Sequence, residues 1–268
     1  MSGLEAFWLG IVQGLTEFLP VSSSGHLVML ETLLGLEGQG GLLFEIGVHV
    51  ATLVAIVIFF RRRIGSLLVG ALRGEATAWR YVAKLALGTL PAVVLALAAR
   101  DFLEAQFALP SVSGVCLLAT GAILWSTRRS VVTAELEEPG FGAALLIGCA
   151  QAIAILPGIS RSGATVAAAL ALRIKPLPAA EFSFLLGIIA ITGAAVLTLP
   201  DASRASREEL MLLGVGGLAA LVSGLAAIWL FIRLLRSRMF HFFAYYAWAV
   251  GGLFLAWLAL SGRLVAGG

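Results

Sequence analysis

One short segment near the start of the chain combines a carboxylate, hydroxyls and an imidazole. Glu17 is followed by Ser22, Ser23 and Ser24, then by Gly25 and His26. Such groups can supply a metal ligand or base, a nucleophile and a proton carrier. Gln13 precedes Glu17 by four residues, which places both on one face of a helix. A cation held by Glu17 would be Mg²⁺ or Ca²⁺, because both prefer oxygen ligands.

A second segment carries the complementary charge. Arg161 stands among small and hydroxyl residues that allow close backbone approach, namely Gly158, Ser160, Ser162, Gly163 and Thr165. A guanidinium beside free N–H groups at a helix start forms an anion cradle, which suits a phosphate. Ser160 and Ser162 can instead be plain helix caps.

Other interpretations of these polar residues stay open. Glu17 can form a salt bridge with Arg161, and His26 can be a hydrogen-bonded core residue. Glu45 and His49 share one helix face and can extend the polar cavity, with Glu45 as a substrate-binding residue, whereas Glu181 is expected to be structural.

The two polar segments are degenerate copies of each other. Residues 13–25 and 151–163 align without a gap and match at the Gln, at two Ser and at the Gly. Their offset is 151 − 13 = 138 residues, about half of the 268-residue chain. Duplicated, interrupted helices are typical of membrane proteins with a site between two repeats.

The composition indicates an integral membrane protein. The chain is 60% hydrophobic and 12% charged, with a mean hydropathy of +1.02, far from the values of soluble domains. The net charge of +3 comes from arginines at segment ends, so we expect no nucleic-acid partner. Cys116 and Cys149 lack metal-like spacing.

The hydrophobic pattern predicts an all-α polytopic fold. We expect six spans, near 43–60, 82–99, 110–126, 182–199, 210–232 and 242–260. Shorter apolar stretches at 4–19 with 25–36, and at 141–156 with 162–173, predict two re-entrant hairpins whose tips lie inside the bundle. An odd number of spans per half inverts the second repeat. The chain then forms one membrane domain of two inverted repeats, about 1–130 and 139–268.

The basic residues predict an orientation. Four of them fall on one face of this scheme, Arg100, Arg204, Arg207 and Arg263, and Arg161 lies at a tip. The other thirteen fall on the opposite face, which the positive-inside rule makes cytoplasmic. Both termini and the opening of the site are therefore expected on the outer face of a bacterial inner membrane.

At both tips the chain resembles the undecaprenyl-diphosphate phosphatase family, which is associated with bacitracin resistance. The resemblance rests on residues 13–26, which fit a Glu/Gln-x-x-x-Glu motif, and on residues 157–165, which fit a Pro-Gly-x-Ser-Arg-Ser-x-x-Thr motif. Gln13 stands where many members carry a second Glu, which removes one negative metal ligand.

The resemblance implies an enzyme that hydrolyses undecaprenyl diphosphate to the monophosphate carrier of cell-wall synthesis, with a divalent cation. It makes Glu17 the essential acid, Ser23 the nucleophile, His26 a catalytic partner or alternative nucleophile, and Arg161 the diphosphate clamp. We expect the membrane and a polyprenyl diphosphate as partners, with a homodimer as an open option. A secondary transporter or lipid flippase is the alternative, because inverted repeats also suit alternating access.

Overall fold

The computed structural model describes residues 1–35, 41–130, 134–202 and 206–263. Arg204, counted above on the less basic face, lies outside this part of the chain. The described residues form twelve α-helices and one short 3-10 helix: α1 (Gly3–Phe18), α2 (Ser23–Leu34), α3 (Gly41–Phe59), α4 (Arg61–Leu72), α5 (Ala76–Ala98), α6 (Arg100–Phe107), α7 (Pro110–Ser130), α8 (Phe141–Ile153), α9 (Arg161–Ala171), α10 (Pro176–Ala202), α11 (Arg207–Arg236), η1 (Phe240–Phe242) and α12 (Phe243–Leu260). A single isolated bridge, Leu136 to Ile174, is the β-type pairing found among them.

Long apolar helices make this a polytopic membrane protein. Within the described residues, five helices are long and apolar enough to cross a membrane, namely α5, α7, the 176–193 part of α10, α11, and η1 with α12. The remaining stretch predicted as a span, 43–60, is helical but breaks after Phe59, where α4 turns by 76° from α3. Together the two helices satisfy the criteria for a sixth span.

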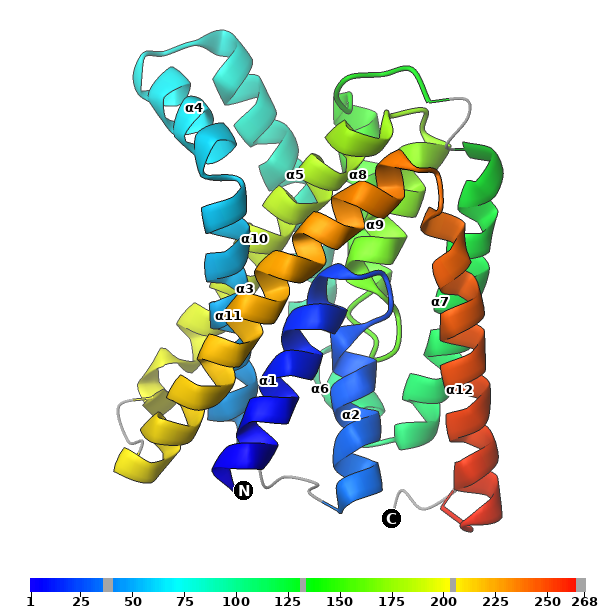
Figure 1. The fold of residues 1–268 in the computed structure, drawn as a ribbon. Helices are drawn as coiled ribbons and strands as arrows, with labels where there is room; N and C mark the ends of the chain where they lie inside the picture. Colours follow the sequence, from blue (N-terminus) through cyan, green and yellow to red (C-terminus); the bar gives the residue numbers. More distant parts are fainter. Residues whose placement is uncertain (36–40, 131–133, 203–205, 264–268) are drawn as a thin grey trace.

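The predicted hairpins are present as helix pairs joined by sharp turns. In Figure 1, α1 and α2 meet in the interior and have their outer ends at the end of the molecule that carries both termini, whereas α8 and α9 enter from the opposite end. Ser22 caps α2 from a backbone with φ of 67°, and Gly158 turns the second tip with φ of 96°. Both turns use a left-handed conformation, which breaks a helix sharply.

Glycine contacts bring the hairpins close to long helices. A Cβ on Gly10 of α1 would lie 2.1 Å from the carbonyl oxygen of Gly216 in α11. A Cβ on Gly148 of α8 would lie 2.2 Å from the carbonyl oxygen of Gly88 in α5. Small residues of this kind are what allow helices in membranes to pack backbone to backbone.

A chain of aromatic rings forms the core behind the first tip. Phe18 packs edge-on against Phe184, Phe184 against Phe231, and Phe231 against Phe240, with ring centroids 5.7, 5.1 and 5.5 Å apart. All four side chains are fully buried. Because Phe18 follows Glu17 directly, this packing fixes the end of α1 and hence the position of the carboxylate.

The segment 61–80 is not the loop that the hydrophobic pattern suggested. It contains α4 and the first turn of α5, and the two form a hairpin that projects from the bundle (Figure 1). Its three leading arginines lower the mean hydropathy below that of a span, although Leu68 and Leu72 remain strongly exposed. An amphipathic helix is apolar on one face only, so a search for continuous apolar stretches of about 20 residues does not find it.

Candidate active site

The carboxylate of Glu17 is the centre of the polar cluster. It lies in the last turn of α1 and is buried, with 6% of its side chain exposed. Gln13, one turn earlier on the same helix face, donates from Nε2 to Glu17 Oε2 over 3.1 Å. The predicted proximity of these two residues is therefore correct, and it follows from helix periodicity alone.

Ser23 reaches back to this carboxylate from the start of α2. Its Oγ donates to Glu17 Oε2 over 2.6 Å. The neighbouring Ser22 is differently engaged, because its Oγ accepts the N–H of Gly25 at 3.3 Å and the N–H of Gly158 at 3.1 Å. Ser22 therefore caps α2 and joins the tips, and Ser24 lies 3.4 Å from the Ser22 hydroxyl. Of the three serines, Ser23 has the hydroxyl aimed at the acid.

Arg161 crosses from the second hairpin to the same carboxylate. Its Nη2 donates to Glu17 Oε1 over 2.6 Å, and 16% of its side chain is exposed. The salt bridge considered from the sequence is thus present. It joins residues 144 positions apart in the chain. Two opposite charges that are both largely buried thus satisfy each other here.

The guanidinium of Arg161 lies where Gly187 of α10 has no side chain. A Cβ on Gly187 of α10 would lie 1.8 Å from Arg161 Nη1. This Nη1 is buried and has no hydrogen-bond partner within the described residues. Thr165 supports the backbone of the same turn, because its Oγ1 donates to the carbonyl of Arg161 at 2.7 Å. One nitrogen of the fork therefore holds Glu17, and the other is buried beside Gly187 without a hydrogen-bond partner among the described residues.

The two tips are in contact through Gly25 and Gly158, and the second tip is also hydrogen-bonded to α7. A Cβ on Gly25 would lie 2.8 Å from the Cα of Gly158. Thr120 donates to the carbonyl of Gly158 at 2.7 Å and accepts the N–H of Ser160 at 3.0 Å. Sequence reasoning missed Thr120, because a threonine in an apolar helix carries no local signal of such a role.

Ser160 has the contacts of a capping residue, and Ser162 lies beside it in the first turn of α9. Ser160 Oγ accepts the N–H of Gly163 at 3.1 Å and lies 3.3 Å from Ser162 Oγ. Both side chains are buried. The capping interpretation of Ser160 is therefore correct in this conformation, and substrate contact by the two serines stays a prediction.

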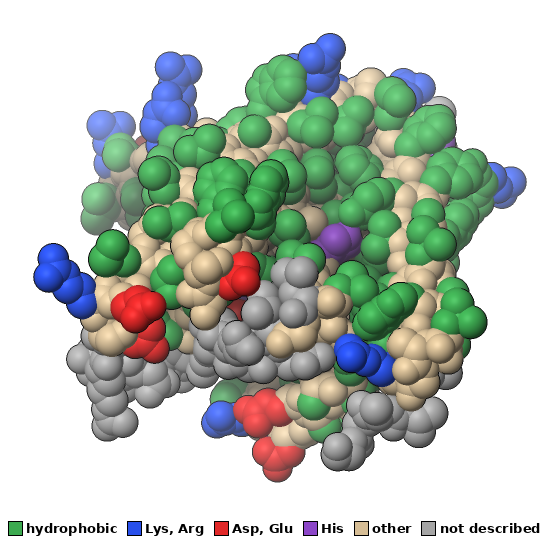
Figure 2. All heavy atoms as spheres, turned by 60° about the horizontal axis from the view of Figure 1, so that its bottom comes forward, with side chains coloured by type: hydrophobic (Ala, Val, Ile, Leu, Met, Phe, Trp, Pro, Cys, Tyr) green, Lys and Arg blue, Asp and Glu red, His purple; other side chains and the backbone are tan. Residues whose placement is uncertain are grey.

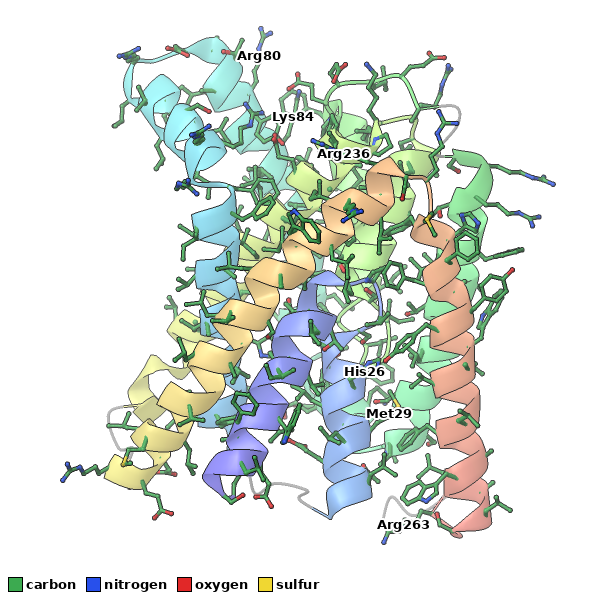
Figure 3. The ribbon with its side chains drawn as sticks, viewed as in Figure 1. His26, Met29, Arg80, Lys84, Arg236 and Arg263 are labelled. Atoms are coloured by element: carbon green, nitrogen blue, oxygen red, sulfur yellow. The ribbon has the colours of Figure 1, made fainter. Side chains whose placement is uncertain are left out.

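His26 makes its bonds on another side of α2. Its Nδ1 lies 2.8 Å from the carbonyl of Ser22, and its Nε2 lies 2.9 Å from the hydroxyl of Tyr246. Figure 3 shows His26 on α2 beside α12, and Figure 2 shows that hydrophobic side chains are abundant on the face that carries the termini. Tyr246, from the far end of the sequence, is a second residue that sequence reasoning missed.

His49 brings a second imidazole to Glu17. Its Nε2 lies 3.8 Å from Glu17 Oε2, and its Nδ1 lies 2.7 Å from the carbonyl of Glu45. Glu45, predicted to bind substrate, thus contributes its backbone to the orientation of His49. Glu181 pairs with Arg63 at 2.8 Å, and the structural role expected for it stays a prediction.

The donors near Glu17 do not form a closed metal cage. No group of three or more His, Cys, Asp or Glu side chains suited to a metal occurs among the described residues. The amide oxygen of Gln13 is buried and lacks a hydrogen-bond partner there. Because Gln13 faces Glu17 with its Nε2, this oxygen would join Glu17 as a ligand of a cation such as Mg²⁺ only after the amide group had turned over.

The hydroxyl of Ser23, bound to Glu17 beside Arg161, has the chemistry of a nucleophile for a phosphate. Comparison with known proteins shows the family. A family model described as bacitracin resistance protein BacA matches residues 6–253. The chain belongs to this family. The resemblance seen at the two tips is therefore confirmed over most of the sequence.

Curated relatives of this BacA-family chain carry the name undecaprenyl-diphosphatase. One from Desulfatibacillum aliphaticivorans is 39% identical over 95% of this chain and 98% of its own length. Another, from Carboxydothermus hydrogenoformans, is 41% identical over 94% of this chain and 95% of its own length. Both names are those of a hydrolase, so they do not favour the transporter alternative.

Proposed function

We propose that this protein is a membrane phosphatase that hydrolyses undecaprenyl diphosphate to undecaprenyl phosphate and phosphate. This reaction recycles the lipid carrier of cell-wall synthesis, and enough of the enzyme confers resistance to bacitracin. The observation that carries the proposal is the meeting of Ser23, Glu17 and Arg161 at the contact of the two tips. The full-length relatives named for this reaction support it.

The geometry supports Ser23 as the nucleophile and Glu17 as its base. Ser23 Oγ attacks the terminal phosphorus, and its proton passes to Glu17 Oε2 along the 2.6 Å hydrogen bond. The bond from that phosphorus to the bridging oxygen breaks, and undecaprenyl phosphate leaves. Water then attacks the phosphoserine, which releases phosphate and restores the hydroxyl. Arg161 stabilises the charge that develops on the equatorial oxygens.

Four other nucleophiles compete with Ser23 in this scheme, namely Ser22, Ser24, His26 and a water molecule. Ser22 already accepts two backbone N–H groups, which lowers the electron density available at its oxygen. His26 can attack only through Nε2, because its Nδ1 faces the carbonyl of Ser22. A water activated by Glu17 would leave no phosphorylated enzyme. Rapid quenching with labelled diphosphate and peptide mapping separates these routes, and label on His26 or no label would reject Ser23.

A divalent cation, Mg²⁺ or Ca²⁺, completes the proposed site. Glu17 and the free amide oxygen of Gln13 would hold it, and the diphosphate would supply further ligands. Such a cation neutralises charge on the transferred phosphoryl group. Binding of Mn²⁺ as a paramagnetic substitute, followed by electron paramagnetic resonance in wild type and Gln13→Leu, tests the donor set without requiring turnover.

We also propose that the fold is an inverted repeat of six spans, with repeats at about 1–130 and 139–268. Equivalent positions support it. Ser22 and Ser160 both cap the second helix of a hairpin, and Gly10 and Gly148 both pack against a glycine carbonyl of a long helix. Each pair differs by 138 residues, the offset of the sequence repeat.

The proposed orientation places both termini and the site opening on the outer face of the bacterial inner membrane. Figure 3 supports this, since Arg80, Lys84 and Arg236 lie at the end opposite the termini and Arg263 lies near them. Cysteine labelling in segment 61–80 tests it, because reaction from the periplasmic side would invert the assignment. A homodimer stays a prediction, which light scattering of the purified protein in detergent tests.

The decisive test of the function is phosphate release by purified protein in detergent, without any membrane gradient. We expect multiple turnovers with undecaprenyl diphosphate, and a turnover lower by a factor of about 10²–10³ with Glu17→Gln, which serves as the matched control. A transporter would bind the lipid but release no phosphate, and that outcome would reject the proposal.

A further inference from the structure

The last helix contributes one polar side chain to the region of the site. Tyr246 of α12 places its hydroxyl 2.9 Å from Nε2 of His26. The two rings also stack, with an interplanar angle of 9° and centroids 5.7 Å apart. A hydrogen bond and a stacking contact to the same ring fix both its direction and its plane, so this contact is more than incidental packing.

The two hydrogen bonds of His26 together define its tautomer. The carbonyl of Ser22 can only accept, so Nδ1 carries the proton in the 2.8 Å contact. In the neutral ring Nε2 then has the lone pair, and the hydroxyl of Tyr246 donates to it. The Ser22 carbonyl and the Tyr246 hydroxyl thus hold the imidazole from opposite sides.

The nitrogen held in this way lies next to the proposed nucleophile. Ser23 and His26 are three residues apart in the first turn of α2, so their side chains leave this turn next to each other but contact different helices. Ser23 faces Glu17 and Arg161, and His26 faces Tyr246. The first turn of α2 therefore carries two engaged polar side chains, one that contacts the carboxylate of Glu17 and one that contacts α12.

We propose that Tyr246 is a positioning residue of this site, which acts through His26. It holds His26 in the tautomer with the proton on Nδ1 and keeps Nε2 directed toward α12 until substrate binds. The inference rests on the proposed function for its kinetic consequence, but the tautomer itself is a property of the resting protein.

The test compares Tyr246→Phe with Tyr245→Phe. The first removes only the hydroxyl that reaches His26. The second is a matched control, because Tyr245 is the adjacent residue, is similarly exposed (51% against 44%), and packs its ring against Trp125. We expect kcat to fall about three- to tenfold in Tyr246→Phe, the effect of one hydrogen bond, with KM within twofold of wild type. Tyr245→Phe should match wild type in both.

Nitrogen NMR of protein labelled with ¹⁵N-histidine gives a second readout that needs no turnover. The chain has three histidines, so the His26 signals can be assigned with His26→Gln. We expect the Nδ1–H tautomer in wild type and in Tyr245→Phe, and a mixture of tautomers in Tyr246→Phe. A wild-type imidazolium or Nε2–H tautomer would overturn the inference, as would unchanged kcat and tautomer in Tyr246→Phe.

Two further outcomes separate this inference from related ones. If Tyr246→Phe behaves as wild type while Tyr246→Leu is impaired, the ring only packs and the positioning role is wrong. If wild type releases no phosphate but shows the expected tautomers, the proposed function fails and the geometry of His26 stands.

Discussion

The two hairpin tips share a scaffold and differ in chemistry. Ser22 and Ser160 occupy equivalent positions, and each accepts the N–H of the glycine three residues on. At other equivalent positions the second tip has Ile155 where the first has Glu17, and Arg161 where the first has Ser23. The duplicated part is the backbone turn, and the divergent part is the set of reactive groups.

The same comparison holds for the paired glutamines. Gln13 donates to Glu17, whereas Gln151 is buried and neither end of its amide has a hydrogen-bond partner among the described residues. In the first copy the amide donates to the carboxylate of Glu17, whereas the equivalent position of the second copy is Ile155. The carboxylate of Glu17 and the hydroxyl of Ser23 thus come from the first tip, and the guanidinium of Arg161 comes from the second.

The largest expected effect on turnover comes from removing the charge that each tip contributes. Glu17→Gln and Arg161→Ala should each lower turnover by a factor of about 10²–10³, because each removes an electrostatic group from the reacting phosphate. Arg161→Lys should also be poor, since an ammonium cannot form the fork. Phosphate release by folded protein measures this, and near-normal turnover in Glu17→Gln or Arg161→Ala would reject the site.

Measuring the free energy of unfolding of the same variants distinguishes the role of each charge in folding from its role in catalysis. Either single variant leaves a buried charge without its partner, which costs up to about 3–5 kcal/mol of unfolding free energy. The double variant Glu17→Gln with Arg161→Gln should recover part of that stability and none of the activity. Equal stability in single and double variants would show that the pair is solvated.

A substitution with a smaller expected effect displaces the guanidinium of Arg161 without removing it. Gly187→Ala places a methyl group where Arg161 Nη1 now lies, so we expect turnover to fall about 10²-fold through misplacement alone. Gly193→Ala on the same helix is the control, because its Cβ would meet nothing within 4 Å. Similar turnover in the two variants would contradict the position of the guanidinium.

The contact between the tips predicts an asymmetry between equivalent glycines. Gly25→Ala pushes a Cβ to 2.8 Å from the backbone of Gly158, whereas Gly163→Ala meets side-chain atoms of Ser160 at 3.0 Å. We expect Gly25→Ala to cost about 1–3 kcal/mol and Gly163→Ala less, because side chains adjust more easily than backbone. Unfolding followed by tryptophan fluorescence in detergent measures both, and a larger loss in Gly163→Ala would refute the tip contact.

The smallest expected effect distinguishes the two glutamines. Gln13→Leu removes a hydrogen bond to Glu17 and should lower turnover about three- to tenfold. Gln151→Leu replaces an unpartnered buried amide by an apolar group of similar size, so turnover should be unchanged and stability equal or higher. A loss of activity in Gln151→Leu would mean that the second copy has a role that its contacts do not reveal.

Much of the fold and part of the site follow from the sequence. Helix periodicity put Gln13 beside Glu17, and turn residues placed Ser22 and Gly158 at breaks, because these depend on a few consecutive residues. The apolar stretches identified the membrane helices for the same reason. The bend after Phe59 did not show, since α4 owes its direction to contacts beyond its own segment.

The sequence by itself determined the membrane class, the two tips, the family resemblance and the types of reactive group. Only the tertiary structure decided which groups meet. It paired Glu17 with Arg161 across 144 residues, directed Ser23 to that carboxylate, and turned His26 to Tyr246, 220 residues away. Local spacing orients side chains within one helix, whereas contacts between helices depend on packing, here on glycines such as Gly187 that leave room for a partner.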